Sequence, residues 1–325
     1  FCDMNEFYNQ KITINKEESL TRLDHALAKL SNLTRSQIKI LLEKGNIKKN
    51  QEIITNASYK VRTGENYNIS IKIFKEEKFK AEDIPLNVIF EDSDIIIINK
   101  IAGMVTHPAP GNKNGTLVNA LLNYSKNNLS NINDNNRPGI VHRLDKETSG
   151  LMVIAKNNNS HFHLAEQFKD HSISRKYKAI VWGVPHNQVI EGYIQRDKNN
   201  RKKMALFHNE KGKYSNTKIK LLKTFQIASI VECILQTGRT HQVRVHMTSI
   251  QSPLIGDKIY GTNKISKFSQ NKDTFNKYLI LKNFSRHALH AYHLGFKHPK
   301  TNKYIEFNSP IPHDMQNLLE LIVRH

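Results

Sequence analysis

The chain has 325 residues, of which 38% are hydrophobic, a size that suits two domains with their own apolar cores better than one small module. It has two cysteines, no apolar run near about 20 residues and no signal-peptide pattern, so we expect a cytoplasmic protein without a disulfide framework or membrane span. The net charge of +20 favours a polyanionic partner such as nucleic acid, although the coding bias of an AT-rich genome toward Lys, Asn and Ile would also make the chain basic.

Residues 18–73 are predicted to form one compact unit that begins with two helices. The second helix is indicated by Thr34 and Gln37, which are spaced as a capping box, so that each side chain satisfies a free backbone N–H group. Gly45 is placed to end this helix in the left-handed conformation. The first helix is indicated by leucines that recur on one helical face, at Leu23, Leu27 and Leu30.

Two short strands are predicted after these helices, over residues 46–48 and 67–71. Basic residues crowd the second helix and the first of the two strands, which indicates either a solvated helix face or a surface that binds RNA phosphates. The candidates for RNA contacts are Arg35, Lys39, Lys48 and Lys49.

Three segments of this unit form a pattern, Arg22-Leu23-Asp24, Thr34-Arg35-Ser36-Gln37-Ile38 and Gly45-Asn46-Ile47-Lys48-Lys49-Asn50. The pattern resembles the S4 domain, a small RNA-binding module of an αα-hairpin and short strands. Gln51 stands where S4 domains usually have the Gly of an Asn-Gly turn. Because Gln tolerates positive φ poorly, we expect the hairpin turn to differ here.

Residues 75–86 are charged and aperiodic, which predicts a linker between an S4 domain over 18–74 and a larger domain over 87–325, with 1–17 as a tail. In the larger domain β-rich segments alternate with a few helices, so we expect an α+β fold. Two early strands and a polar surface loop are expected over residues 88–90, 95–98 and 126–136.

The segment 137–156 gathers polar groups around one carboxylate, that of Asp145. The segment opens with a Pro-Gly loop and ends in an apolar strand, and His142, Arg143 and Thr148 lie close to Asp145 in the sequence. Cationic surroundings keep a carboxylate ionised, and an oriented, ionised carboxylate can act as a nucleophile. An Asp that only caps a turn would fit the same local pattern.

Two further segments contain candidate site residues. Tyr177 lies in a segment with the pattern of a strand, where half-buried packing is the usual role of a Tyr. The apolar spacing within residues 240–250 favours a helix capped by Thr240, although the alternation would also suit a strand. His241 and His246 have no Cys or carboxylate spaced to complete a zinc site, so no metal is expected there.

Three motifs together resemble those of the RluA-type pseudouridine synthases: His-Arg-Leu-Asp before Thr-Ser-Gly at Asp145, Arg-Lys-Tyr ending at Tyr177, and Gly-Arg-Thr-His-Gln-Val-Arg ending at Arg244. In that family the Asp attacks the target uridine, the glycosidic bond breaks, and the uracil is rejoined through carbon. The resemblance implies that Asp145 is the nucleophile, Tyr177 stacks on the uracil, and Arg244 pairs with Asp145. It further implies that Arg143 enters the RNA stack where the target nucleotide flips out. Other candidates for substrate or RNA contacts are His142, Thr148 and Arg239.

The family resemblance also implies a catalytic domain of two mainly antiparallel sheets flanked by helices, with the active-site cleft between them. An S4 domain joined to this domain, together with Val105-Thr106-His107-Pro108 leading into Gly111-Asn112, looks most like the RluD-type enzymes, which modify uridines in the helix 69 loop of 23S ribosomal RNA. Because the reaction is an internal isomerisation, no cofactor and no metal are implied. We expect a monomer whose partner is 23S rRNA or the pre-50S subunit.

Three alternatives remain open on the sequence. An RluC-type enzyme, or a relative acting on transfer RNA, would keep the chemistry and change the target. An S4-bearing RNA-binding or assembly factor would have an inactive catalytic domain, against which the intact Asp145, Tyr177 and Arg244 argue. A nucleoside glycosidase would usually deploy a pair of carboxylates, whereas the motifs single out Asp145.

Overall fold

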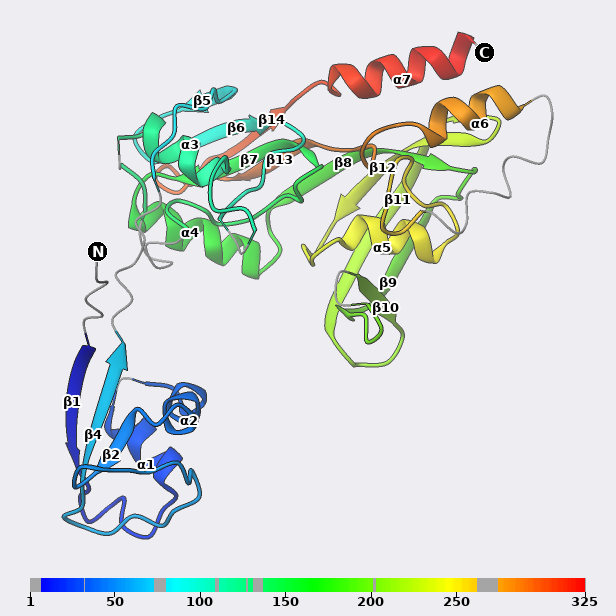
Figure 1. The fold of residues 1–325 in the computed structure, drawn as a ribbon. Helices are drawn as coiled ribbons and strands as arrows, with labels where there is room; N and C mark the ends of the chain where they lie inside the picture. The colour runs from blue at the N-terminus through cyan, green and yellow to red at the C-terminus, as the bar shows by residue number, and fades with distance from the viewer. Residues whose placement is uncertain are drawn as a thin grey trace, which may run out of the picture. The chain divides into compact units, whose positions relative to one another are not determined.

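The computed structural model divides into two compact units, Phe1–Glu77 and Lys78–His325, here called the N-terminal unit and the C-terminal unit (Figure 1). The smaller unit contains a four-stranded sheet and the larger one a ten-stranded sheet. The structure describes residues 7–31, 33–72, 80–108, 111–126, 128–130, 137–200, 203–261 and 274–324.

The N-terminal unit comprises β1 (Phe7–Thr13), α1 (Leu23–Leu30), α2 (Arg35–Glu43), β2 (Ile47–Lys49), β3 (Glu52–Ile53) and β4 (Asn66–Lys72). Its strands form an antiparallel sheet with the order β1-β4-β2-β3, and the two helices pack together beside it (Figure 1). The predicted helices and strands are therefore confirmed. The apolar faces meet in one core that includes the buried side chains Leu23, Leu27, Ile38, Leu42 and Tyr67.

Local signals set the ends of α2 and the turn that follows β2. The Thr34 hydroxyl accepts a hydrogen bond from the Gln37 backbone N–H, and the Gln37 side chain accepts one from the Thr34 backbone, as the capping box predicts. Gly45 has the predicted positive φ of 70°. The expectation of a different hairpin turn is wrong, because Asn50 and Gln51 both adopt positive φ, at 46° and 78°. The β2–β3 pairing holds Gln51 in this uncommon conformation.

The C-terminal unit has an α+β fold, as predicted. The strands expected over 88–90 and 95–98 are β5 and β6, and the apolar strand after Asp145 is β7. The element bounds are β5 (Val88–Glu91), β6 (Ile95–Lys100), α3 (Leu117–Tyr124), β7 (Ser149–Ala155), α4 (Asn158–Lys169), β8 (Ser174–Trp182), β9 (Gln188–Arg196), β10 (Met204–Phe207), β11 (Lys213–Phe225), β12 (Ala228–Leu235), α5 (Gln242–Ser249), α6 (Phe275–Lys282), β13 (Leu289–Lys297), β14 (Tyr304–Asn308) and α7 (His313–Arg324).

The strands of this unit form two antiparallel halves, β10-β9-β11-β12-β8 and β7-β6-β5, and β13 joins them into one sheet, with β14 on β13. The two mainly antiparallel sheets that the family resemblance implies are thus the two halves of a continuous ladder. The β13–β7 pairing, which is parallel, covers two residue pairs. Figure 1 shows α3 and α4 beside the β5–β7 half and α5 beside the other half.

Gly150 explains how β7 comes so close to β13. A Cβ at this position would lie 2.3 Å from the backbone oxygen of Ala291, and φ is 127°, so a side chain would meet both a clash and backbone strain. Gly150 lies at the start of β7, five residues after Asp145. The glycine therefore allows the loop that carries Asp145 to sit at the junction of the two halves.

The segment after Thr240 is helical, as favoured from the apolar spacing, but its predicted cap is wrong. α5 begins at Gln242, and its N-cap residue is His241, which has a φ of 58° and makes no side-chain capping bond. The left-handed turn at His241 moves the start of the helix past Thr240.

Two expectations fall wholly or partly outside the described residues. The first part of the linker predicted over 75–86 lies outside the described residues, and residues 81–86 contain no helix or strand. Most of the surface loop predicted over 126–136 also lies outside the described residues. Within the described parts of the chain, none of the helices has the length and apolarity needed to cross a bilayer.

Candidate active site

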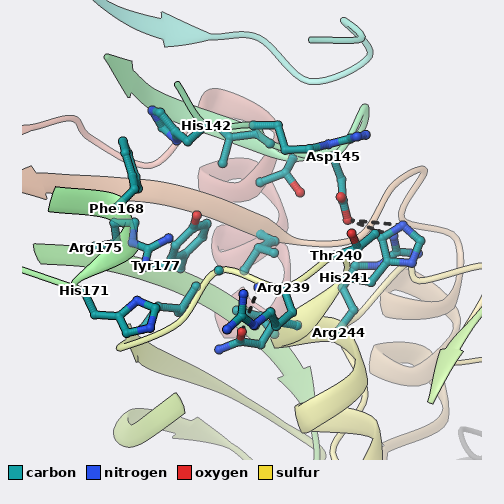
Figure 2. Close-up of a pocket in the computed structure, with 18 of the residues that line it drawn as sticks. His142, Asp145, Phe168, His171, Arg175, Tyr177, Arg239, Thr240, His241 and Arg244 are labelled. Carbon is teal, nitrogen blue, oxygen red and sulfur yellow. Dashed lines mark hydrogen bonds and ion pairs between the residues drawn. The ribbon is translucent and has the colours of Figure 1, made fainter. Parts of the chain in front are cut away.

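A cavity of about 240 Å³ opens in the C-terminal unit between the loop before β7, strand β8 and the start of α5. The three sequence motifs meet at this cavity (Figure 2). Its lining contains one carboxylate, that of Asp145, among aromatic, aliphatic and basic side chains. The arginines of the lining are Arg143, Arg175, Arg239 and Arg244.

Asp145 shares the buried guanidinium of Arg244 with a second carboxylate, Asp257. Nε and Nη2 of Arg244 donate to the two carboxylate oxygens of Asp257, at 2.8 and 3.0 Å. Nη1 donates to Oδ2 of Asp145 at 3.0 Å. The side chain of Asp257 is 0% exposed and that of Asp145 is 18% exposed. Asp257 therefore fixes the plane of the guanidinium, and Asp145 stays reachable from the cavity.

The pair of Arg244 and Asp257 is charged at neutral pH. Burial opposes both charges, but their mutual hydrogen bonds and attraction outweigh it, so that the pKa of Arg244 is raised and the pKa of Asp257 is lowered. A single guanidinium shared by two carboxylates neutralises only one of them. The arrangement orients Asp145 without cancelling the negative charge of the cluster.

His241 approaches Asp145 from the turn before α5. Its Nε2 lies 3.8 Å from Oδ2 of Asp145, and its Nδ1 lies 2.8 Å from the Tyr260 hydroxyl. The Tyr260 oxygen accepts a hydrogen bond from the backbone N–H of Met204, which leaves its proton for Nδ1 of His241. The arrangement that satisfies these groups puts the imidazole proton on Nε2, facing Asp145. Burial lowers the pKa of His241, which favours this neutral form.

Tyr177 and Arg175 project from the same face of β8 into the cavity, since successive side chains of a strand alternate in direction. Burial raises the pKa of Tyr177, so its hydroxyl is protonated at neutral pH. The charges of both Arg175 and Asp145 act on this phenol, which places Tyr177 within electrostatic reach of each.

The loop of Asp145 is held from behind by two histidines. Oγ1 of Thr148 lies 2.7 Å from Nε2 of His287, and Oγ of Ser149 lies 2.9 Å from Nδ1 of His290. Thr148 is 2% exposed. Thr148 lines the cavity, and its buried hydroxyl, bonded to His287, positions the loop; its contact with a substrate stays a prediction.

Lys100 clamps the same loop from the other side. Its ammonium group donates to the backbone oxygens of Ile101, Met104 and Lys146, at 2.9, 2.9 and 3.2 Å. Burial lowers the pKa of Lys100 to about 7, and the charge of Asp145 acts in the opposite direction. Lys100 thus joins the end of β6 to the residue that follows Asp145.

The other residues of this unit that were predicted to contact RNA differ in whether their side chains are bonded within the protein or exposed. The ring of His142 stacks on Phe168 at 4.6 Å, and its Nε2 accepts a backbone hydrogen bond from β7, so it builds the cavity wall. Burial lowers the pKa of His142 to about 3, which keeps it neutral. Arg239 donates from Nε to the backbone oxygen of Tyr214 at 2.7 Å. Arg143 is exposed.

In the N-terminal unit the predicted basic surface is organised around the buried carboxylate of Asp24. Arg22 and Arg35 donate to its two oxygens at 3.0 and 2.9 Å, and Lys39 lies 3.9 Å away. The hydrogen bond from Arg22 is the main reason that the pKa of Asp24 is lowered to about 2. Each of the three cations keeps between 40% and 49% of its side chain exposed, so they form one cationic surface.

Lys48 and Lys49 point to different surroundings, as neighbours on a strand do. Lys48 is exposed, which leaves it available to a polyanion. Lys49 forms an ion pair with Glu65 at 2.6 Å and lies over the ring of Tyr59 at 4.5 Å. Lys49 is therefore part of an internal ion pair of the N-terminal unit, and its contact with RNA stays a prediction.

Sequence reasoning assigned no role to several side chains that build the site. Asp257 and Tyr260 contact Arg244 and His241, yet they lie more than ten residues beyond them in the chain. The signal that could have found them is the Asp-Lys-Ile-Tyr-Gly segment at 257–261. Lys100 stands at the end of an apolar strand, where a charged residue needs a partner.

Comparison with known proteins points to one family. Residues 94–249 match the family described as RNA pseudouridylate synthase, and residues 21–66 match the S4 domain. The human protein "RNA Pseudouridylate Synthase Domain Containing 4" has a similar fold, with a TM-score of 0.57, 22% identity, and coverage of 73% of this chain and 93% of that one.

Two relatives are similar over nearly the whole chain. "Ribosomal large subunit pseudouridine synthase D" of Zymomonas mobilis is 41% identical over 97% of this chain and 98% of its own length. "Uncharacterized RNA pseudouridine synthase YlyB" of Bacillus subtilis is 39% identical, over 95% of this chain and 96% of its own. The chain therefore belongs to the RNA pseudouridine synthase family.

Proposed function

We propose that the protein converts specific uridines of the large-subunit ribosomal RNA into pseudouridine, with Asp145 as the nucleophile. The observation that carries this proposal is the geometry of Asp145, the one carboxylate in the cavity lining, which is oriented by Arg244 and remains partly exposed. The relatives named as ribosomal large-subunit enzymes, which align along the full chain, support the choice of RNA.

The reaction requires a flipped uridine whose ribose faces Asp145. The carboxylate attacks C1′, the bond from C1′ to N1 breaks, and the uracil is rejoined through C5. Arg244 keeps the attacking oxygen in place, and Asp257 keeps Arg244 in place. Tyr177, a protonated phenol on the cavity wall, packs against the base.

RNA binding is proposed to involve both units. Arg143 is exposed beside the cavity and fills the RNA stack when the target nucleotide leaves it. The cationic surface formed by Arg22, Arg35 and Lys39 in the N-terminal unit contacts RNA phosphates. By resemblance to the RluD-type enzymes, the target is the helix 69 loop of 23S rRNA, presented free or within the pre-50S subunit.

Three further expectations belong to this proposal. The reaction is an isomerisation without net oxidation or reduction, so the protein needs no cofactor. It acts as a monomer, and it acts in the cytoplasm, where bacterial ribosomes are assembled.

The test is incubation of the purified protein with 23S rRNA transcript and with large subunits, followed by chemical mapping of pseudouridine. We expect sites in the helix 69 loop, and we expect Asp145→Asn to lose at least about three orders of magnitude in rate while it retains RNA affinity. Asp83→Asn, which alters an exposed carboxylate outside the cavity lining, is the control. Sites in other rRNA loops or in transfer RNA would reassign the target, and wild-type activity of Asp145→Asn would remove Asp145 from the mechanism.

A further inference from the structure

Arg175 is a buried cation in the cavity wall that lacks a carboxylate partner among the described residues. It is 8% exposed, and its one hydrogen bond within the described structure runs from Nη2 to the backbone oxygen of Gln236 at 3.3 Å. Its Nε is buried and has no hydrogen-bond partner. Arg175 lines the same cavity as Asp145, so this incompletely paired guanidinium lies at the wall of the space where a substrate would lie.

Leaving a guanidinium in this state is costly, because burial removes water without supplying an anion. The ring of Phe168, 5.4 Å from the guanidinium carbon, provides a weak cation–π contact. Burial is the main reason that the pKa of Arg175 is lowered; Tyr177 opposes this shift, and the charge of Arg239 adds to it. The buried guanidinium therefore lowers the stability of the folded protein.

The surrounding chain is shaped to leave room for this guanidinium. A Cβ on Gly238 would lie 2.3 Å from Nη1 of Arg175, so even an alanine would push the group out of place. Gly238 belongs to the Gly-Arg-Thr-His segment that leads into α5. A ligand site needs hydrogen-bond donors that no acceptor of the protein occupies, and the guanidinium of Arg175 has such donors.

We propose that Arg175 binds a carbonyl oxygen of the target uracil and stabilises the negative charge that the ring acquires when it leaves C1′. This role rests on the proposed function. As Asp145 attacks, the electron pair of the C1′–N1 bond passes to the uracil, which becomes an anion with its charge spread over N1, O2 and O4. When C5 then bonds to C1′, the bond between C1′ and the Asp145 oxygen breaks and the carboxylate is restored. The ring gives up its C5 proton and N1 takes up a proton, so the product is an isomer. A fixed cation near the carbonyl oxygen lowers the barrier to the first of these steps.

The position of Arg175 favours the base over an RNA phosphate as its acceptor. Arg175 lies beside Tyr177 on the same strand face, and Figure 2 shows it next to Tyr177 and Phe168. A flipped nucleotide inserts its base most deeply, whereas its phosphates stay near the surface. A cation that is 8% exposed therefore suits the base.

The experiment compares Arg175→Met with Lys176→Met, which removes the same charge from the other face of β8. Single-turnover rates are measured on a 23S rRNA fragment that contains either uridine or 5-fluorouridine at the target. Fluorine withdraws electrons, so the detached 5-fluorouracil needs less help to hold its charge. Reaction of the fluorinated site is followed as loss of 5-fluorouridine from nuclease digests.

We expect Arg175→Met to slow the uridine substrate about 100-fold and the fluorinated substrate about 10-fold or less, with RNA affinity changed less than about threefold. Arg175→Lys should recover part of the rate, because it keeps the charge but not the planar fork. Gly238→Ala should show the same preference for the fluorinated substrate. The thermal midpoint of Arg175→Met should equal or exceed that of the wild type, since an unpaired buried charge has been removed.

The outcomes separate this inference from the function on which it rests. An equal slowing of both substrates, or an unchanged rate, would overturn the role of Arg175 while the wild type and Lys176→Met still form pseudouridine. A weaker affinity with a salt dependence reduced by about one unit would assign Arg175 to a phosphate instead. If the wild type forms no pseudouridine on any RNA, the proposed function fails, and this inference fails with it.

Discussion

Each unit of the protein contains a cluster of arginine and aspartate, and the two clusters are built in opposite ways. In the N-terminal unit the carboxylate of Asp24 is fully buried and its cations are about half exposed. In the C-terminal unit the cation, Arg244, is buried, and Asp145 keeps an exposed edge. The member of each cluster that stays reachable has the charge that the proposed ligand requires: cations for RNA phosphates, and a carboxylate for the C1′ carbon of a ribose.

The difference also concerns geometry. Arg244 uses its whole fork, with two donors on Asp257 and one on Asp145, so its position is fixed by bonds in one plane. Arg35 uses one donor toward Asp24 and leaves the rest of its guanidinium to solvent. Precise orientation is needed where a bond is made, whereas a cationic surface needs only the correct charge and rough position.

The largest effect that distinguishes the clusters is expected from Arg244→Lys. A lysine keeps the charge, but its single ammonium group cannot reach both carboxylates in the fork geometry, so Asp145 loses its orientation. We expect the single-turnover rate of pseudouridine formation to fall by about three orders of magnitude, with RNA affinity nearly unchanged. A rate within tenfold of the wild type would show that the charge alone of Arg244 matters.

A second, smaller effect is expected in the stability of the C-terminal unit at acid pH. His246 is fully buried between the hydroxyls of Ser215 and Thr217, and burial lowers its pKa to about 4. Between pH 6.5 and 4 the unfolded chain binds a proton that the folded form does not, so stability falls as the pH falls through this window, by about 1.4 kcal/mol per pH unit.

The measurement is the free energy of unfolding of the C-terminal unit between pH 7 and 4.5, for the wild type and for His246→Gln. The variant should show a shallower dependence by about 1.4 kcal/mol per pH unit, whatever its stability at pH 7. The sequence of the N-terminal unit contains a single histidine, His25, which is exposed, so the transition of that unit should lack this dependence. Parallel curves for the wild type and the variant would contradict the prediction.

A third effect is expected in RNA affinity. Replacing Arg35 and Lys39 together by alanine removes two cations of the surface around Asp24, so binding to a 23S rRNA fragment should weaken by about tenfold at 0.15 M salt. The slope of log K against log salt should become shallower by about two units, with the rate at saturating RNA retained. The control is the double alanine variant of Lys11 and Lys16, which are exposed outside this surface. Equal losses in both variants would indicate a general effect of net charge.

The smallest effect is expected from Arg35→Lys, the counterpart of the first substitution. Because Arg35 makes one bond to Asp24 and otherwise offers a charge, the lysine should bind RNA within about twofold of the wild type. A tenfold loss of affinity would mean that the guanidinium of Arg35 makes a shaped contact, and the contrast between the two clusters would then disappear.

The sequence was most informative where a structure depends on neighbouring residues. The capping box at Thr34 and the left-handed Gly45 follow from local backbone requirements, and both are present. Asp145, Tyr177 and Arg244 were found because each stands in a motif with a family resemblance. Their convergence on one cavity joins residues up to 99 positions apart, and spacing alone could not have predicted it.

The features that the sequence did not reveal concern burial and distant partners. Thr148 looks like an accessible hydroxyl beside Asp145, but His287, 139 residues away, occupies it. Arg175 looks like one of many strand cations until the fold shows that its Nε has no partner. His241, which adopts the left-handed turn, similarly has its partner Tyr260 beyond α5.

The short pairing between β7 and β13 has a consequence for how the catalytic groups are held together. Asp145 enters from the half of the sheet that contains β5, β6 and β7, whereas Arg244, Tyr177 and Arg175 belong to the other half. The backbone ladder between the halves consists of two residue pairs beside Gly150. The 3.0 Å hydrogen bond between Arg244 and Asp145 therefore also joins the two halves of the sheet, and a shift of one half against the other would lengthen it.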